Sequence, residues 1–168
     1  MKPARDLPVA DVMTHLVVTL KPTDTLHEAA QRLACHNVSG APVVVHGKVE
    51  GIISESDIVR AISDTTKRRT SLSILDWIGN RTERTGRAAD GKLVVDVMSP
   101  IVLVITPDRS VWDAAQVMAQ RGVNRLPVVD DEDYLIGIIT RGDLVRAVAR
   151  DQIPVAGDSE SEAVLPTR

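Results

Sequence analysis

Two stretches of the chain, residues 25–36 and 110–121, carry apolar side chains at the spacing of an amphipathic helix. In the first stretch the apolar positions run i, i+3, i+4, i+7 and i+8, at Leu26, Ala29, Ala30, Leu33 and Ala34. In the second stretch they fall at Val111, Ala114, Ala115, Met118 and Ala119. Each stretch opens with a hydroxyl residue followed three positions later by an acidic one, which is typical of a capped helix start. The spacing therefore predicts two capped helices.

Shorter apolar runs indicate strands around each of these helices. LVVTL at 16–20 and IVLVI at 101–105 precede the helices, and each helix is followed by two runs joined by a turn, PVVV-HGK-VEGII and PVV-DDEDY-LIGII. A last helix is expected at 55–64 and again at 141–150. The order β-α-β-β-α therefore occurs twice. It predicts an α+β fold of two pseudo-symmetric repeats packed through their sheets into one module.

The two halves are also copies at the level of individual residues. DVM at 11–13 recurs at 96–98, an offset of 85 residues, and PVV at 42–44 recurs at the same offset. One extra residue in the acidic turn raises the offset to 86, at which GII at 51–53 recurs at 137–139. A single gap placed in a turn indicates an internal duplication.

The duplication sets the predicted domain organisation. A first repeat occupies 8–64 and a second occupies 93–150. The linker at 65–92 contains a candidate short helix around Trp77, and the polar tail at 151–168 is expected to be disordered.

The composition narrows the classes of function. The 168 residues carry a net charge of −3 and a pI of about 5.8, which argues against a broad nucleic-acid surface. A single cysteine, Cys35, allows no internal disulfide. The apolar runs are too short to span a bilayer, and the N-terminus lacks the apolar core of a secretory signal. These features together predict a cytoplasmic protein.

The repeated motifs resemble those of a known family. Each copy carries DVM followed by Thr or Ser, then PVV, then GII-[S/T]-x-x-D, in the same order. A doubled unit with these motifs is similar to the tandem CBS domain pair, also called a Bateman module, and looks like the stand-alone bacterial proteins of that type. The resemblance covers both repeats but neither the linker nor the tail.

The resemblance implies a regulatory sensor with no catalytic activity of its own. Such pairs bind adenosine-containing ligands (AMP, ADP or ATP, in some cases S-adenosylmethionine) in two clefts between the repeats, and they commonly form homodimers. No obligatory cofactor is implied, because the nucleotide acts as a regulatory ligand. By favouring one mutual orientation of the repeats, the ligand would signal its presence to a partner protein.

Each implied cleft combines residues of both repeats. One cleft would contain Ile52, Ser54, Ser56, Asp57, Ile101, Val102, Val123, Arg125 and Pro127. The other would contain Leu16, Val17, Val38, Gly40, Pro42, Ile138, Thr140, Arg141, Gly142 and Asp143. In the family the apolar members sandwich adenine, the Asp holds the ribose and the Ser or Thr lies near the α-phosphate. Arg125 matches a phosphate contact of the family, which Gly40 lacks, so we expect the Asp57 cleft to bind AMP or ADP more tightly.

The residues themselves leave another interpretation open. Ser-Glu-Ser-Asp at 54–57 and Thr-Arg-Gly-Asp at 140–143 each lie where a strand becomes a helix, and free amides there suit a phosphate. A carboxylate can also accept both hydroxyls of a ribose. The same spacing, however, is a capping-box variant that needs no ligand. A ligand-independent dimeric scaffold with vestigial clefts and an S-adenosylmethionine binder therefore remain alternatives, with nucleic-acid binding through the linker arginines as a third.

Other conspicuous residues have ordinary explanations. The four histidines lack metal-ligand spacing, so no metal site is expected, and Cys35 has no flanking base that would make it a nucleophile. The acidic run at 130–133 is expected to be a solvated hairpin turn, and the basic run at 67–69 a solvated part of the linker. Trp77 could bury itself in an interface or cover the protein's own core.

Overall fold

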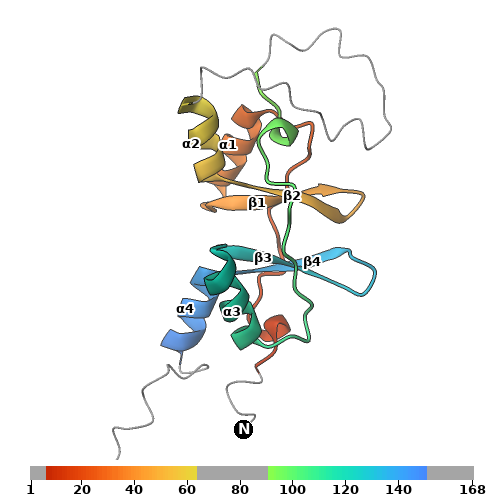
Figure 1. Ribbon diagram of the computed structural model, residues 1–168, viewed down its shortest axis with the longest axis vertical. Coiled ribbons are helices and arrows are strands. Elements are labelled where there is room, and N and C mark those ends of the chain that lie inside the picture. The colour runs from red at the N-terminus through yellow and green to blue at the C-terminus, as the bar shows by residue number, and fades with distance from the viewer. Residues whose placement is uncertain (1–6, 64–90, 151–168) are drawn as a thin grey trace, which may run out of the picture. The chain divides into compact units, whose positions relative to one another are not determined.

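The computed structural model describes residues 7–63 and 91–150, which Figure 1 shows in colour. The first repeat contains α1 (Leu26–Cys35), β1 (Gly40–Val45), β2 (Lys48–Ser54) and α2 (Glu55–Ser63). The second contains α3 (Val111–Arg121), β3 (Arg125–Val129), β4 (Leu135–Thr140) and α4 (Arg141–Ala149). This mixture of helices and strands confirms the α+β class. The predicted linker helix with Trp77, the basic run at 67–69 and the tail at 151–168 lie outside the described residues.

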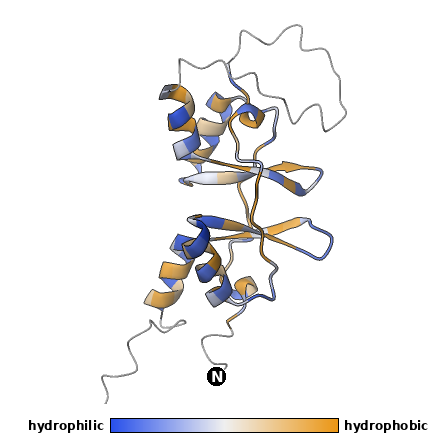
Figure 2. Cartoon of the chain, in the orientation of Figure 1, coloured by the Kyte–Doolittle hydropathy of each residue, from blue (hydrophilic) through white to orange (hydrophobic). Residues whose placement is uncertain are grey.

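Both predicted capping boxes are present at the starts of α1 and α3. The Glu28 amide donates to Thr25 Oγ1 at 3.2 Å, and the Thr25 amide donates to the Glu28 carboxylate at 2.7 Å. Ser110 and Asp113 repeat this exchange, with the Asp113 amide 3.0 Å from Ser110 Oγ. These bonds satisfy amides that a helix start would otherwise leave unpaired. Hydrophilic and hydrophobic bands alternate along the helices in Figure 2, as the apolar spacing predicts.

The two hairpins use different turns. β1 and β2 pair antiparallel and are joined by His46 and Gly47, whose φ angles of 51° and 83° are typical of a type I′ turn. The longer turn between β3 and β4 is held by Asp130, whose carboxylate accepts the amides of Glu132 at 3.0 Å and Tyr134 at 2.9 Å. The residues between Asp130 and Tyr134 are exposed, which confirms that the acidic run is a solvated turn.

The two predicted first strands, 16–20 and 101–105, are wrong in extent, because each contributes only one paired residue. The Leu20 amide donates to Pro42 O at 3.0 Å, and the Val44 amide donates to Leu20 O at 2.8 Å. Continuing this parallel ladder needs an N–H at Pro42 in one direction and at Pro22 in the other. Proline has none, so the pairing ends on both sides.

The second repeat shows the same truncated pairing. The Ile105 amide donates to Pro127 O, and the Val129 amide donates to Ile105 O, each at 3.0 Å. Pro127 and Pro107 occupy the positions of Pro42 and Pro22. Each regular sheet therefore has two strands, β1 with β2 and β3 with β4.

The segment that leads into each repeat bonds to the other repeat. The Val9 amide donates to Arg109 O at 2.8 Å, and the Val111 amide donates to Leu7 O at 2.8 Å. One repeat later, the Val94 amide donates to Asp24 O at 2.8 Å. Residues 7–10 thus lie at the start of α3, and residues 92–95 lie at the start of α1. Each compact unit of the fold therefore combines the body of one repeat with the leading segment of the other.

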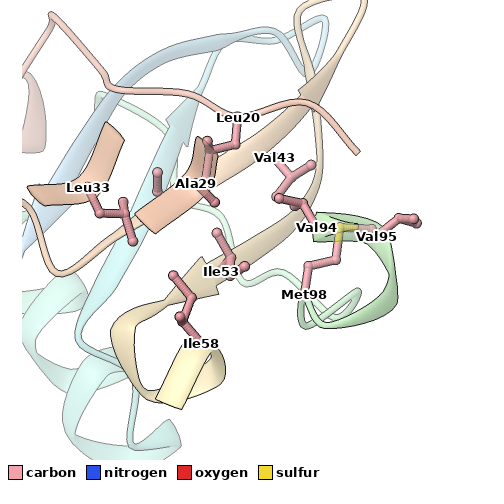
Figure 3. Packing of buried hydrophobic residues seen from close by; sticks show 10 residues of the cluster. Leu20, Ala29, Leu33, Val43, Ile53, Ile58, Val94, Val95 and Met98 are labelled. Carbon is pink, nitrogen blue, oxygen red and sulfur yellow. The ribbon is translucent and has the colours of Figure 1, made fainter. Parts of the chain in front are cut away.

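The described residues divide into two compact units on this basis. The first unit comprises 7–15, 104–129 and 137–150, and the second comprises 16–63, 91–103 and 130–136. In the second unit, α1, α2 and the β1–β2 hairpin share a core with the 3₁₀ turn at Val94–Asp96, and Figure 3 shows that turn beside β1. The buried members of this core are Leu20, Ala29, Leu33, Ala41, Val43, Ile53, Ile58, Val94, Val95 and Met98. The scarcity of aromatic residues leaves an aliphatic core, as the composition predicts.

Candidate functional site

The corner where β2 becomes α2 is closed by a reciprocal cap between Ser54 and Asp57. Asp57 Oδ2 accepts the Ser54 amide at 2.9 Å and the Ser54 hydroxyl at 2.6 Å. In return the Asp57 amide donates to Ser54 Oγ at 3.4 Å. The Asp57 side chain is only 12% exposed, and its Oδ1 accepts from Arg60 Nη1 at 3.2 Å. The carboxylate is thus held in place by the helix that it caps.

The equivalent corner between β4 and α4 has the same arrangement. Asp143 Oδ2 accepts the Thr140 amide at 2.7 Å and the Thr140 hydroxyl at 2.6 Å. The Asp143 amide donates to Thr140 Oγ1 at 3.3 Å, and Arg146 donates to Asp143 Oδ1. With 5% of its side chain exposed, Asp143 is even more buried than Asp57. Both carboxylates therefore serve as caps, as the alternative interpretation of the motif predicts.

The backbone at each corner is partly used by neighbouring loops. The Glu55 amide donates to Ser39 O at 3.1 Å, and the Arg141 amide donates to Asn124 O at 3.0 Å. The sequence suggested that the first-turn amides would be free for a phosphate. Among the described residues, the caps and these loop contacts engage two of the three first-turn amides of each helix. The third is the amide of Ser56 in α2 and of Gly142 in α4.

The strand that leads into each corner, β2 or β4, pairs with a residue that lies just before an apolar segment. Ile52 exchanges two backbone hydrogen bonds with Ser99, at 2.9 and 3.0 Å, within the second unit. Two residues beyond Ser99, Ile101 is 86% exposed. Ile52, Ser54, Asp57 and residues 101–102 thus belong to one unit, and their association in a site stays a prediction.

The strand that leads into the second corner is paired in the same way, because Ile138 exchanges hydrogen bonds with Thr14 at 2.9 and 3.0 Å within the first unit. Leu16, two residues beyond Thr14, is 92% exposed but belongs to the second unit. An exposed aliphatic side chain therefore recurs at the same position of both repeats. Such a side chain can contact the face of a flat ligand, because it loses water-exposed apolar surface when it does so.

The remaining predicted site residues differ in burial. Arg125 is 8% exposed at the start of β3, and Gly40 is buried at the start of β1 opposite Ser54. Glu55, Ser56 and Arg141 are exposed on the first helical turns. Pro42 and Pro127 are buried, Val17, Val38, Val102 and Val123 are partly buried, and Gly142 is exposed.

The predicted grouping of these residues divides between the two units. Val123, Arg125 and Pro127 belong to the first unit, whereas the Asp57 corner belongs to the second. Similarly, the Asp143 corner belongs to the first unit, whereas the residues predicted to face it belong to the second, namely Leu16, Val17, Val38, Gly40 and Pro42. The composition of the two complete clefts therefore stays a prediction.

Sequence reasoning missed the two arginines that pair with the carboxylates. Arg60 and Arg146 lie three residues after Asp57 and Asp143, where helix geometry brings side chains together. They also occupy equivalent positions of the two repeats. That combination of spacing and repetition was visible in the sequence and could have identified them.

No cluster of three or more His, Cys, Asp or Glu side chains within 7–63 and 91–150 is arranged to hold a metal ion. Among the helices of these two ranges, none has the length and apolarity needed to cross a membrane.

Comparison with known proteins places the repeats in a family. The family model described as the CBS domain matches twice, at residues 9–64 and 94–150. The chain belongs to the CBS domain family. Its two matches form a tandem CBS pair, in agreement with the resemblance seen in the repeated motifs.

Proteins from distant organisms are similar to the chain over most of its length. It is 36% identical over 157 residues to the uncharacterized protein MJ1426 of Methanocaldococcus jannaschii, with 83% of this chain and 90% of that protein covered. The CBS domain-containing protein YhcV of Bacillus subtilis is 36% identical, with 81% of each covered. The chloroplastic CBSX1 of Arabidopsis thaliana is 35% identical over 83% of this chain, which spans 61% of CBSX1.

Solved CBS pairs with bound ligands share the fold. The structure of CBSX2 in complex with AMP has a TM-score of 0.67 and 29% identity, covering 87% of this chain and 98% of that one. The CBS domain pair of protein MJ0100, in complex with 5′-methylthioadenosine and S-adenosyl-L-methionine, has a TM-score of 0.68 and 26% identity. That comparison covers 86% of this chain and 97% of the other.

Proposed function

We propose that this CBS pair is a non-catalytic sensor of adenine nucleotides. The observation that carries the proposal is the chemistry shared by the ligands of two similar CBS pairs. AMP, 5′-methylthioadenosine and S-adenosyl-L-methionine all contain adenine and a ribose with free 2′- and 3′-hydroxyls. The ligand-binding features expected of this chain are therefore those that recognise an adenosine group.

The two capped corners supply features that suit this group. The carboxylate of Asp143 is buried, that of Asp57 is partly buried, and both are held in fixed positions, so little ordering is needed when a hydroxyl donates to them. In the unit of Asp57, the exposed side chain of Ile101 offers apolar surface for the base. A free amide in the first turn of α2 or α4 can donate to an anion near the positive end of the helix dipole.

The sequence predicts that the two sites differ in their affinity for phosphate. Arg125 precedes Leu126-Pro127, whereas Gly40 stands at the equivalent position of the first repeat. A charge-assisted contact between an arginine and a phosphate contributes about 1.5–3 kcal/mol, which corresponds to tenfold or more in affinity. We therefore predict that the site of Asp57 binds AMP or ADP more tightly than the site of Asp143, and that this preference depends on Arg125.

Isothermal titration calorimetry with AMP, ADP, ATP and S-adenosylmethionine tests the proposal. Asp57→Ala and Asp143→Ala should each remove one class of site, and the Asp57 variant should lose the tighter one. Because both carboxylates also cap helices, circular dichroism must show that each variant is folded at the titration temperature. Equal losses in both variants would rule out the asymmetry, and no binding of any adenosine ligand by the wild-type protein would rule out the sensor.

A ligand-independent scaffold is the second candidate, because α2 and α4 expose apolar side chains. Val59 and Val145 are exposed at equivalent positions of the two repeats, and Ile62 is exposed one turn beyond Val59. Isolated apolar residues are common on surfaces, but a repeated set is suited to self-association. We propose a homodimer through these helices, in which Val59→Lys and Val145→Lys would shift light-scattering mass toward the monomer. Dimerisation without nucleotide binding would favour the scaffold.

The partner that such a sensor would regulate is an unidentified protein. A cytoplasmic location stays a prediction from the sequence.

A further inference from the structure

The ion pairs Arg60–Asp57 and Arg146–Asp143 occupy the carboxylate oxygens that a ribose would need. We propose that Arg60 and Arg146 are displaceable guards, which the paired hydroxyls of an adenosine ligand replace on the carboxylate. This inference rests on the proposed function, since it concerns how the same two corners would accept their ligand. It assigns a role to two residues that are not among the predicted ligand contacts.

Counting hydrogen bonds on each carboxylate shows the conflict. A carboxylate has about four acceptor positions, two on each oxygen. Asp143 Oδ2 already accepts the Thr140 amide and hydroxyl, and Oδ1 accepts from Arg146. One position therefore remains, on Oδ1. A ribose offers two neighbouring hydroxyl donors, so one existing donor must leave if both are to bind this carboxylate.

The arginine is the donor that leaves at least cost. The Thr140 amide is fixed in the backbone, and the Thr140 hydroxyl also accepts from the Asp143 amide at 3.3 Å, so losing it would open the helix cap. The Arg146 side chain, in contrast, is 61% exposed, and water can solvate its guanidinium once it is released. Because the arginine end of the pair is solvent-exposed, water can replace its contact, and the exchange for ligand hydroxyls is reversible.

The first repeat has the same geometry with a looser pair. Asp57 Oδ2 accepts both Ser54 donors, and Arg60, with 74% of its side chain exposed, reaches Oδ1 at 3.2 Å. The arrangement occurs twice at equivalent positions, although the two repeats differ at the cap residue and at both residues before the Asp. A guard role accounts for the cap hydroxyl, the carboxylate and the arginine that recur at both corners.

Arg146 also lies over the first turn of α4. A Cβ built at Gly142 would lie 3.4 Å from Arg146 Nη1, so the guanidinium lies close to the residue whose amide the cap leaves unused. Displacing Arg146 would therefore free a carboxylate oxygen close to that amide.

Neutral ligands provide the sharpest test, because they do not respond to the loss of a positive charge. Adenosine and 2′,3′-dideoxyadenosine are titrated calorimetrically into the full-length wild-type protein and into Arg60→Gln and Arg146→Gln. Each variant should bind adenosine about two- to fivefold more tightly at its own site, the gain expected when an exposed ion pair no longer competes. Dideoxyadenosine, which lacks both hydroxyls, should bind wild type and variants equally.

Matched variants separate displacement from other effects. Arg121→Gln removes the same charge from the exposed end of α3 and should change neither affinity. Arg60→Lys keeps a cation near Asp57 and should restore most of the wild-type affinity for adenosine.

Three results would overturn the inference. Unchanged or weaker adenosine binding by both glutamine variants would show that the arginines position the carboxylates rather than guard them. An equal gain for dideoxyadenosine, or the same gain in Arg121→Gln, would show that the hydroxyls are not involved. These results would leave the proposed function intact, whereas a wild-type protein that binds neither adenosine nor AMP would refute the proposed function and this inference with it.

Discussion

Replacing Gly51 by alanine tests the exchange of leading segments, because the new methyl group would meet a residue from the start of the other repeat. A Cβ built at Gly51 lies 2.5 Å from Met98 Sδ, 3.0 Å from Met98 Cγ and 3.1 Å from Ser99 O. Met98 is buried, and Ser99 is held by its two backbone hydrogen bonds to Ile52. Neither neighbour can move away freely. The methyl group would therefore overpack the second unit.

The size of this effect follows from two opposing contributions. Overpacking a well-filled core typically destabilises a protein by about 1–3 kcal/mol. Alanine also has less conformational entropy than glycine in the unfolded chain, which stabilises the folded state by about 0.4–1 kcal/mol. The net loss for Gly51→Ala should be about 1–2 kcal/mol. In a protein of this size that corresponds to a decrease in Tm of roughly 2–8 °C.

The equivalent position of the second repeat provides an internal comparison. A Cβ at Gly137 meets only Met13 atoms, at 2.6 Å from Sδ, 3.2 Å from Cγ and 3.3 Å from Cε. Met13 is partly exposed and its flexible side chain can turn aside. Gly137→Ala should therefore cost less than Gly51→Ala, about 0–1 kcal/mol.

Chemical denaturation of a double-mutant cycle measures whether the clash is with Met98. Met98→Ala alone leaves a cavity and destabilises the protein. In that background, however, the alanine at position 51 has room, so its cost should fall by at least half. An unchanged cost in the Met98→Ala background, or no cost for Gly51→Ala in the wild type, would refute the packing of residues 92–99 on the first repeat.

Three further predictions concern single interactions of the fold. Thr140→Ala should lower the free energy of unfolding by about 1 kcal/mol through loss of the α4 cap, and Thr140→Ser should not; equal denaturation midpoints for the two variants would contradict the cap. The hydrogen bond from Thr106 holds the pKa of Asp108 below its ordinary value of 3.8, so this carboxylate stabilises the fold above its unfolded pKa and the contribution is lost as the pH falls through the folded pKa. In Thr106→Val, NMR titration should find the pKa of Asp108 raised, and an unchanged midpoint would exclude the hydrogen bond as the cause. Tyr134→Ala should cost about 0.5–1 kcal/mol in denaturation experiments because Lys48 Nζ lies 5.3 Å from the ring centroid, while Tyr134→Phe should be neutral; a loss in the phenylalanine variant would assign the effect to the hydroxyl instead.

Much of the local structure could be predicted from the sequence because its determinants lie close together along the chain. The caps at Thr25 and Ser110 depend on residues three positions away, and the apolar faces of α1 and α3 depend on spacing alone. The same is true of the corners at Asp57 and Asp143. For these motifs the sequence predicted the positions but not whether the carboxylates cap helices, hold ligands or do both.

The predicted first strands failed for a reason that the sequence contained. Apolar runs at 16–20 and 101–105 satisfy a strand pattern, but pairing also requires an N–H from each partner at alternate positions. Pro22 and Pro42 interrupt that series on either side of Leu20, and Pro107 and Pro127 do so around Ile105. Reading the prolines together with the expected neighbour strand would have limited each run to one paired residue.

The exchange of leading segments could not be predicted in this way. Val9 and Val94 occupy equivalent positions, so an internal repeat allows each segment to bond to its own repeat or to the other with the same contacts. Local pattern is identical in the two cases, and only the path of the chain distinguishes them. An internal repeat is therefore informative about the elements and ambiguous about which copy each segment joins.

Capping and ligand binding are compatible functions for Asp57 and Asp143. A cap fixes the carboxylate before any ligand arrives, so the ordering cost is met during folding rather than during binding. The same coupling means that removing either Asp changes stability and affinity together, which weakens alanine substitution as evidence for a ribose contact. Changing the ligand instead leaves the cap intact. A wild-type protein that distinguishes adenosine from 2′,3′-dideoxyadenosine would therefore implicate the carboxylates more directly than substitution of either aspartate.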